Sequence, residues 1–362
     1  MDEKLEKLKS LHAKHSRYLP AVFFVLGFLL DVFTLGRIDN VVNIIQQVIY
    51  LGVVSRILYF KALEESGLWS PQGFWQKIWK YDVEILHFLL GSLLSAYTIF
   101  YFVSASLATS LVFMNFMILV LVANELPMFQ KQSLPLKMGL FQICLLSFFS
   151  YFIPIVVQFV NIVTLIGACV LALAVAYSSY KALMKKGMEK DDALRFQIIP
   201  GVSVVGVILI LFALKLLPPI PVSVQYMGVY HDVQKDNAEY VLSYDRPWYK
   251  FWQNGAQSYE AQPGDKVILF ARIFSPANMD DHVQFHWQQY IRGKWQSSDR
   301  VKIRVVGGRG EGFRAYSTKS NFDEGEWRVK IETLDGREMG RLSFDIKKVT
   351  AGGDRDFRID RF

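Results

Sequence analysis

The sequence predicts a membrane bundle of about seven α-helices, followed by an all-β domain of the immunoglobulin-like sandwich type. Apolar residues make up 52% of the chain, and before Pro218 they gather in runs of the ~20-residue length that crosses a bilayer. After Pro221 apolar and polar residues alternate with a period of two, which is typical of half-buried strands. The stretch Pro218-Pro219-Ile220-Pro221 separates the two patterns, so it predicts a stiff exit from the last membrane helix.

Seven apolar runs are long enough to cross a membrane: Leu19–Gly36, Val41–Phe60, Ile85–Val103, Ser106–Leu126, Met138–Val157, Val160–Tyr180 and Ile198–Leu217. Lysine and arginine concentrate before the first run and in every second connection, whereas the three alternate short connections contain only Arg37. By the positive-inside rule, the N-terminus is then cytoplasmic and the β domain lies on the other side. The split near Pro154 is open to revision, and one span fewer would place the β domain in the cytoplasm.

Four parts follow from these patterns: a cytoplasmic amphipathic segment (1–17), the transmembrane bundle (18–218), an extracytoplasmic β-sandwich domain (219–348) and a flexible tail (349–362). In the first part Leu5, Leu8 and Leu11 stand at helical spacing among lysines, which suits a helix on an anionic membrane face. A frayed tail that only fixes the orientation explains the same residues. The tail is rich in glycine and charge, so we expect it to be loose.

The strands of the β domain are predicted from their alternation. Val301–Val305, Trp327–Ile331 and Leu342–Ile346 alternate apolar with polar residues, and Val267–Phe274 is apolar on both faces, as in a central strand. Turn signals such as Pro263-Gly264-Asp265 separate these runs. Seven or eight short strands at this spacing predict an antiparallel sandwich.

Several kinds of chemistry lack their motifs. Cys144 and Cys169 both fall in predicted spans, so the β domain has no disulfide and no cysteine-based zinc site. No hydrolase, nucleotide-binding or metalloprotease motif occurs, and Gly307-Gly308-Arg309-Gly310 joins two strand patterns as a turn. Lysine plus arginine nearly balance aspartate plus glutamate after Pro218, which argues against nucleic acid. We therefore expect no cofactor, no metal and no catalytic site, although an enzyme built from separate helices stays open.

Distinctive stretches lie in both halves of the chain: Gly307–Ser320, Gly325–Val329, Asp335–Arg337 and Gly340–Phe344, and in the membrane half Phe28–Asp39, Ser92–Tyr97, Ser104–Leu107, Ala123–Glu125 and Pro218–Pro221. Together they resemble the bacterial domain-of-unknown-function family numbered 2914, and the C-terminal stretches are the more specific. The resemblance implies a multi-pass protein of the Gram-negative inner membrane with a periplasmic β domain. It brings no established activity and no catalytic residues.

Ionisable groups inside or near the spans are candidates for function, because burying an unpaired charge in a bilayer costs several kcal/mol. The candidates are Asp31, Arg37, Asp39, Arg56, Glu84, His87, Glu125 and Lys215. Asp31 and Lys215 stand near the outer ends of their spans, so a pair between them is feasible. These groups could form an ion path or a pocket for a lipid head, or they could be packing ion pairs and interfacial charges.

Aromatic and small residues add two further observations. Trp75 and Trp79 are four residues apart on one helical face, which indicates an anchor at the lipid headgroups or a partner surface. Ala168, Ala172 and Ala176 allow close helix packing. This packing could lie within the bundle or in a homo-oligomer.

In the β domain, His282, Gln284, His286 and Gln288 share one strand face, which we expect to be solvated. Two histidines four apart on a strand are ~13 Å apart, too far to share one metal ion. A basic face for an acidic partner is predicted if the strands share a sheet, from Lys302, Arg304, Arg314, Arg328, Lys330 and Arg341.

Two functions remain. In the first, a non-enzymatic membrane protein presents its β domain to a protein or cell-envelope partner. In the second, the bundle is a transporter, a channel component or a lipid-modifying enzyme that uses its polar residues. Both need the lipid bilayer as a partner.

Overall fold

The computed structural model describes residues 29, 31, 33, 35–125, 133–237, 239–308, 310–349 and 355–362. The chain forms two compact units. The helical unit contains Met1–Phe102, Val112–Ile153 and Leu165–Leu211. The β unit contains Val103–Leu111, Pro154–Thr164 and Phe212–Phe362, so two helix-to-helix connections belong to it together with the C-terminal domain.

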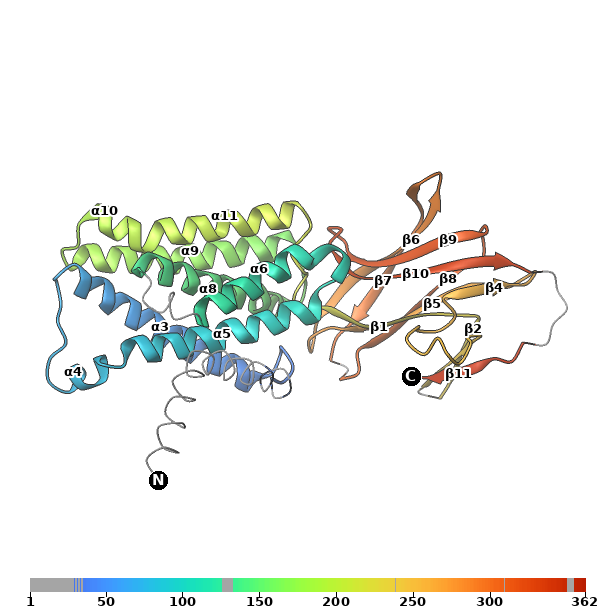
Figure 1. Ribbon diagram of the computed structural model, residues 1–362, viewed down its shortest axis with the longest axis horizontal. Coiled ribbons are helices and arrows are strands. Elements are labelled where there is room, and N and C mark those ends of the chain that lie inside the picture. The colour runs from blue at the N-terminus through green and yellow to red at the C-terminus, as the bar shows by residue number, and fades with distance from the viewer. Residues whose placement is uncertain are drawn as a thin grey trace, which may run out of the picture. The chain divides into compact units, whose positions relative to one another are not determined.

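Long apolar helices make up most of the helical unit (Figure 1). The helices are α3 (Val41–Glu65), α4 (Phe74–Trp79), α5 (Asp82–Ser104), α6 (Leu107–Glu125), α8 (Leu134–Val157), α9 (Ile162–Lys185), α10 (Lys190–Ala193) and α11 (Ile199–Ala213), with a π-helical turn Leu194–Ile198 between the last two. Among the described residues, five helices are long and apolar enough to cross a membrane, and a shorter apolar helix covers Ala108–Asn124. The predicted first span, Leu19–Gly36, lies mostly outside the described residues.

The helices near Pro154 divide as the sequence predicts. Pro154 lies in the last turn of α8, and α9 begins after a short break. Asn161 caps α9, because its Oδ1 accepts hydrogen bonds from the backbone N–H groups of Val163 (2.8 Å) and Thr164 (3.2 Å). Two separate helices therefore occupy residues 134–185.

Small residues bring α9 and α11 together. Ala168, Ala172 and Ala176 are buried on α9, and a Cβ on Gly201 of α11 would lie 3.5 Å from Cβ of Ala176. This contact explains the alanine spacing by packing inside the bundle. The end of α11 corrects the sequence prediction, since the helix stops at Ala213 and not at Leu217. Lys215 follows with a φ of 58°, a left-handed conformation that ends helices.

Three sheets form the β unit (Figure 1). Its strands are β1 (Ser223–Tyr230), β2 (Asp232–Asp236), β3 (Glu239–Tyr244), β4 (Ser258–Ala261), β5 (Val267–Phe274), β6 (Asp280–Ile291), β7 (Lys294–Val306), β8 (Phe313–Lys319), β9 (Gly325–Thr333), β10 (Glu338–Lys348) and β11 (Arg358–Arg361). The sheet orders are β1-β5-β8, β4-β10-β9-β6-β7 and β11-β3-β2. All pairs are antiparallel except β4 with β10.

Strand β5 is buried on both faces, as its composition predicts. On one face Phe270 meets Tyr240 of β3 (ring centroids 5.7 Å apart) and Phe362 (5.3 Å). The other face of β5 lies toward the five-stranded sheet. A hydrogen bond joins the two sheets there, from Trp287 Nε1 of β6 to Ser317 Oγ of β8, the strand next to β5 (3.1 Å). The core therefore continues from the small C-terminal sheet through β5 to the five-stranded sheet.

The strand count and the tail differ from expectation. The described residues contain eleven strands and not seven or eight, because short, polar strands such as β2 lack a clear alternation. The end of the expected loose tail forms β11, which pairs with β3. It is fixed there by backbone hydrogen bonds in both directions between Phe362 and Tyr240, at 2.8 and 3.1 Å. The segment 350–354 lies outside the described residues.

The proline-rich exit is part of the β unit and not an exposed linker. Every residue from Leu217 to Val222 is buried, and Val222 belongs to the domain core. Burial on this scale fixes the start of β1 against the sheets.

A buried histidine gives the β unit a predicted pH dependence. His231 stacks on Tyr259 (centroids 4.0 Å apart), and Arg355, which also bonds Asp265 at 2.7 Å, donates to its Nδ1 at 3.3 Å. Burial, followed by the charge of Arg355, lowers the pKa of His231 to about 4. In the unfolded chain the histidine pKa is ~6.5. As the pH falls, the unfolded chain therefore binds a proton at His231 before the folded chain does.

We expect His231 to cost the β unit up to ~3 kcal/mol of unfolding free energy as the pH falls from about 6.5 to about 4. In His231→Gln this part of the pH dependence should disappear, whereas His282→Gln, at an exposed histidine, should keep it. The measurement is the unfolding midpoint of the purified full chain at pH 7 and pH 4, followed by tryptophan fluorescence. Equal loss of stability in wild type and His231→Gln would contradict the assignment.

Candidate functional site

One face of the five-stranded sheet collects polar and charged side chains from four strands. Gln284 of β6 stands opposite Lys302 of β7 and Glu332 of β9, and His286 stands opposite Arg300 and Lys330. Side chains of directly opposite residues project from the same face. The opposite face carries Val283, Phe285 and Trp287 into the core.

This face is not solvated along β6, contrary to the sequence prediction. Gln284, His286 and Gln288 expose only 7%, 4% and 8% of their surface, and only His282 is exposed. The reason is their central position: β6 lies between β7 and β9, whose long polar side chains cover it. Buried polar groups require partners, and these three form a connected network.

His286 is at the centre of the network. Its Nδ1 lies 3.3 Å from Glu332 Oε2 and its Nε2 lies 2.9 Å from Ser297 Oγ. Burial lowers the pKa of His286, although the Glu332 carboxylate acts in the opposite direction. The neutral ring satisfies both contacts when Nδ1–H donates to Glu332 and Nε2 accepts from the hydroxyl of Ser297.

Glu338 is the most completely paired carboxylate on this face. Its side chain is 3% exposed, and it accepts hydrogen bonds from Arg341 Nε (2.8 Å) and Nη2 (2.6 Å) and from Ser106 Oγ (2.5 Å). Lys330 Nζ is 3.3 Å away. Burial alone would raise the pKa of Glu338, but these hydrogen bonds and charges outweigh it and hold the pKa below its usual value.

A pocket of about 380 Å³ opens beside this network. Its lining comes from the sheet, from the turn Leu334–Gly336, from Thr109 at the start of α6 and from Lys215 after α11, all of which belong to the β unit. Thr109 Oγ1 is buried and has no hydrogen-bond partner among the described residues. The pocket therefore combines an unused hydroxyl with charged side chains.

The charges around the pocket do not cancel. The carboxylates of Glu332, Glu338 and Asp335 are matched by three cations, because Lys330 and Arg341 contact Glu338, Lys330 also approaches Glu332, and Arg337 pairs with Asp335. Lys215 and Arg300 also line the pocket. Within the described part of the chain, neither of the two forms an ion pair. Two positive charges at the pocket therefore have no carboxylate partner in this part of the chain.

Five of the six residues of the predicted basic face lie in one sheet. Lys302 and Arg304 of β7, Arg328 and Lys330 of β9 and Arg341 of β10 share the five-stranded sheet, whereas Arg314 lies on β8 in another sheet. Several of these cations are already engaged. Arg304 forms a bidentate pair with Asp280, Arg314 contacts Glu311 at 3.3 Å, and Arg328 bonds Gln288 (2.7 Å) and lies 4.1 Å from the Trp295 ring.

The predicted polar residues of the helices fall into separate local contacts. Asp31 accepts a hydrogen bond from Ser95 at 2.6 Å, and Arg37 pairs with Asp39 at 2.9 Å just before α3. His87 lies 3.5 Å from Asn124, while Glu84 is exposed in the first turn of α5. The side chain of Glu125 lies outside the described part. The pairing of Asp31 with Lys215 stays a prediction, since the two belong to different units.

Arg56 occupies a different environment. It is exposed on α3 and lines a pocket of about 690 Å³ together with the aromatic residues Phe60, Trp69, Trp75 and Trp79. Its guanidinium lies 5.9 Å from the Phe60 ring centroid.

Sequence reasoning missed Ser106, Thr109, Ser297 and Arg300. Ser106 and Glu338 are 232 residues apart in the chain, so no local pattern connects them. Arg300 belongs to the same alternation as Lys302 and Arg304, and that alternation could have identified it.

Residues 280–346 match the model of a family described as a protein of unknown function (DUF2914). This segment carries the family's sequence pattern. The resemblance expected from the sequence is thereby confirmed over β6 to β10, the stretch that supplies four of the five strands of the polar sheet. No curated protein matches the chain.

Solved structures give only distant similarity. An immunoglobulin-like protein from Pseudomonas aeruginosa is 14% identical, with 35% of this chain and 96% of that chain covered and a TM-score of 0.22. A β-glucosidase from Listeria innocua in complex with glucose is 11% identical, with 26% and 15% covered and a TM-score of 0.21. A Pseudomonas fluorescens alkylpurine DNA glycosylase bound to DNA is 9% identical, with 82% and 96% covered and a TM-score of 0.23.

Removing the charge of Glu338 should destabilise the β unit. Glu338→Gln leaves Lys330 and Arg341 without their shared carboxylate, and loss of one partner from a buried pair typically costs about 3–5 kcal/mol. The measurement is the unfolding free energy of the full chain in detergent. Glu311→Gln removes the exposed partner of Arg314 and should change stability by less than about 0.5 kcal/mol. Equal effects of the two variants would contradict the role given to Glu338.

Proposed function

We propose that this chain is a multi-pass protein of the bacterial inner membrane, with a cytoplasmic N-terminus and a periplasmic β domain. In this proposal the β domain is an immunoglobulin-like interaction module that binds an acidic group on a protein or cell-envelope partner. The binding site is the sheet-face pocket described above. The helices then act as an anchor that positions the module.

The apolar helices support the membrane part of the proposal, which counts seven spans. The five long helices and the shorter α6 account for six apolar segments, and the run Leu19–Gly36 supplies a seventh. The alternation of Lys and Arg between connections favours a cytoplasmic N-terminus. An odd number of spans then places the β domain in the periplasm.

The observation that carries the binding role is the surplus of hydrogen-bond donors in the pocket. The neighbouring carboxylates are satisfied inside the chain, whereas Lys215, Arg300 and the hydroxyl of Thr109 have no counterpart among the described residues. A carboxylate, phosphate or sulfate group accepts bonds from such donors. Acidic groups are common on envelope polymers and on protein surfaces, so the pocket fits an envelope partner better than a neutral small molecule.

The orientation predicts which cysteines a membrane-impermeant maleimide can reach in spheroplasts. Ser298→Cys, at an exposed position of β7, should be labelled from outside, and Lys186→Cys, exposed after α9, only after permeabilisation. The wild-type chain is the background control, because Cys144 and Cys169 are buried. The reverse labelling pattern would overturn the orientation.

The pocket predicts the outcome of photo-crosslinking in native membranes. With a photoreactive residue at the exposed position Leu334 on the pocket wall, a crosslinked partner should form in wild type. It should decrease by about thirtyfold or more in Lys215→Gln/Arg300→Gln, since each of the two lost charge-assisted bonds weakens binding by about 1 kcal/mol or more. The matched control, Lys294→Gln/Arg358→Gln, changes two exposed cations outside the pocket. Equal loss in both double variants would show that overall charge and not the pocket controls binding.

A further inference from the structure

The helical unit carries a second site, an aromatic groove between α3, α4 and the start of α5. One wall comes from α3, whose residues Ile49, Val53, Arg56 and Phe60 stand three or four positions apart and therefore share a helix face. Trp75 and Trp79 of α4 face them across the groove, which has a volume of about 690 Å³. This volume is large enough for a lipid headgroup or the first part of an acyl chain.

The base of the groove is held by fixed contacts. Phe60, Trp69 and Trp79 form a cluster, with ring centroids 4.8 Å apart for Phe60–Trp69 and 5.0 Å apart for Trp69–Trp79. Trp79 Nε1 donates to Glu64 at 2.8 Å, and Lys61 pairs with Asp82. The Lys61–Asp82 pair is neutral as a whole, and the hydrogen bond to Glu64 together with the ring contacts fixes the orientation of the Trp79 indole.

Unlike the residues at the base of the groove, Arg56 and Trp75 have polar groups without a partner among the described residues. Arg56 forms no ion pair or hydrogen bond within the described residues, and its guanidinium lies near the face of the Phe60 ring. Trp75 is 63% exposed, and its indole N–H has no acceptor in the described part of the chain. The groove therefore offers one uncompensated positive charge and hydrogen-bond donors beside an apolar wall.

The position of Arg56 along α3 indicates which kind of group can neutralise its charge. Arg56 is nine residues before Glu65, the last residue of α3, so it lies about 14 Å from that helix end along the axis. Residues on the same side, including Ile45 and Ile49, are more than half exposed. In a bilayer this stripe meets acyl chains, where an unpaired arginine is costly. A phosphate from the membrane removes that cost.

We propose that this groove binds an anionic phospholipid. The phosphate accepts hydrogen bonds from Arg56 and Trp75, and one acyl chain lies along Ile49 and Val53. A zwitterionic lipid brings its own ammonium group and leaves the arginine charge uncompensated, so an anionic lipid is preferred. The N-terminal segment of this chain is a poorer occupant by charge, since it carries Lys4, Lys7, Lys9 and Lys14. The proposal needs α3 to lie in a bilayer but does not depend on the orientation or on the sheet-face pocket.

Tryptophan quenching by brominated lipids tests the site. The full chain is reconstituted in nanodiscs of phosphatidylethanolamine that contain either dibromo-phosphatidylglycerol or dibromo-phosphatidylethanolamine, each over the same series of low fractions. Three of the eight tryptophans line the groove. In wild type we expect quenching at several-fold lower concentrations of the anionic lipid. Arg56→Gln should reduce that preference by about fivefold, the effect expected when one ion pair is lost.

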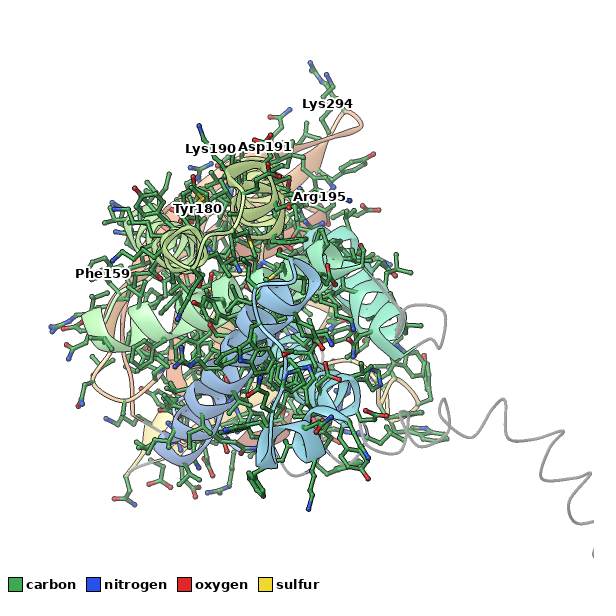
Figure 2. All side chains as sticks on the ribbon, turned by 90° about the vertical axis from the view of Figure 1, so that its left-hand side faces the viewer. Phe159, Tyr180, Lys190, Asp191, Arg195 and Lys294 are labelled. Carbon is green, nitrogen blue, oxygen red and sulfur yellow. The ribbon has the colours of Figure 1, made fainter. Side chains whose placement is uncertain are left out.

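Matched variants separate the site from general electrostatics. Arg195→Gln makes the same charge change at an exposed residue near the end of the helical unit that faces the viewer in Figure 2, and it should keep the preference. Arg56→Lys retains the positive charge in the groove and should keep most of the preference. Trp75→Phe should lose part of it. Equal quenching by both lipids in wild type, or an unchanged preference in Arg56→Gln, would overturn the proposal.

Discussion

The buried carboxylate of Glu338 holds together three separate parts of the β unit. A charge that is almost fully removed from water is tolerated only when its oxygens are paired. Its partners come from three residues further along its own strand (Arg341), from β9 (Lys330) and from the residue just before α6 (Ser106). The same carboxylate therefore joins two strands of the sheet to a connection between two membrane-type helices, and the polar pocket forms where these elements meet.

The two faces of the five-stranded sheet have different roles. One face supplies Phe285, Trp287 and Val329 to a continuous apolar core, which fixes the strands in register. Because that face provides the burial, the other face is free to hold a network whose members satisfy each other instead of a hydrophobic layer. The segment that matches the family model contains most of this sheet, so the network is built from the stretch of sequence that the family shares.

The sequence predicted those features that depend on local pattern. The helix break was predicted near Pro154, and β5 was predicted from a short run that is apolar on both faces. The strands β2 and β11 could not be predicted, because one is polar and the other is four residues long. The burial of His286 was mispredicted for another physical reason. Alternation tells which side of a strand faces the core, but it does not tell whether neighbouring strands bury the other side.

The site residues likewise divide into those that a local sequence pattern reveals and those that depend on the fold. Lys302, Lys330 and Arg341 were found because they alternate with apolar residues in clear strands. Ser106 was not, since its role depends on a hydrogen bond to Glu338, 232 residues further along the chain. Thr109 was not, since only the folded chain brings it to the pocket wall. Arg56 was recognised as an arginine within a span, but its place beside a tryptophan-lined groove required the arrangement of three helices.

The strand β7 has a consequence for how copies of this protein meet. It is an edge strand of the five-stranded sheet, so one side of its backbone has no strand partner in that sheet. Edges of this kind template pairing between molecules, and charged side chains oppose it. Asp299, Arg300, Lys302 and Arg304 stand in succession along β7. Copies of a protein confined to one membrane share one orientation and meet repeatedly, so charges along an exposed strand edge oppose its pairing with a second copy.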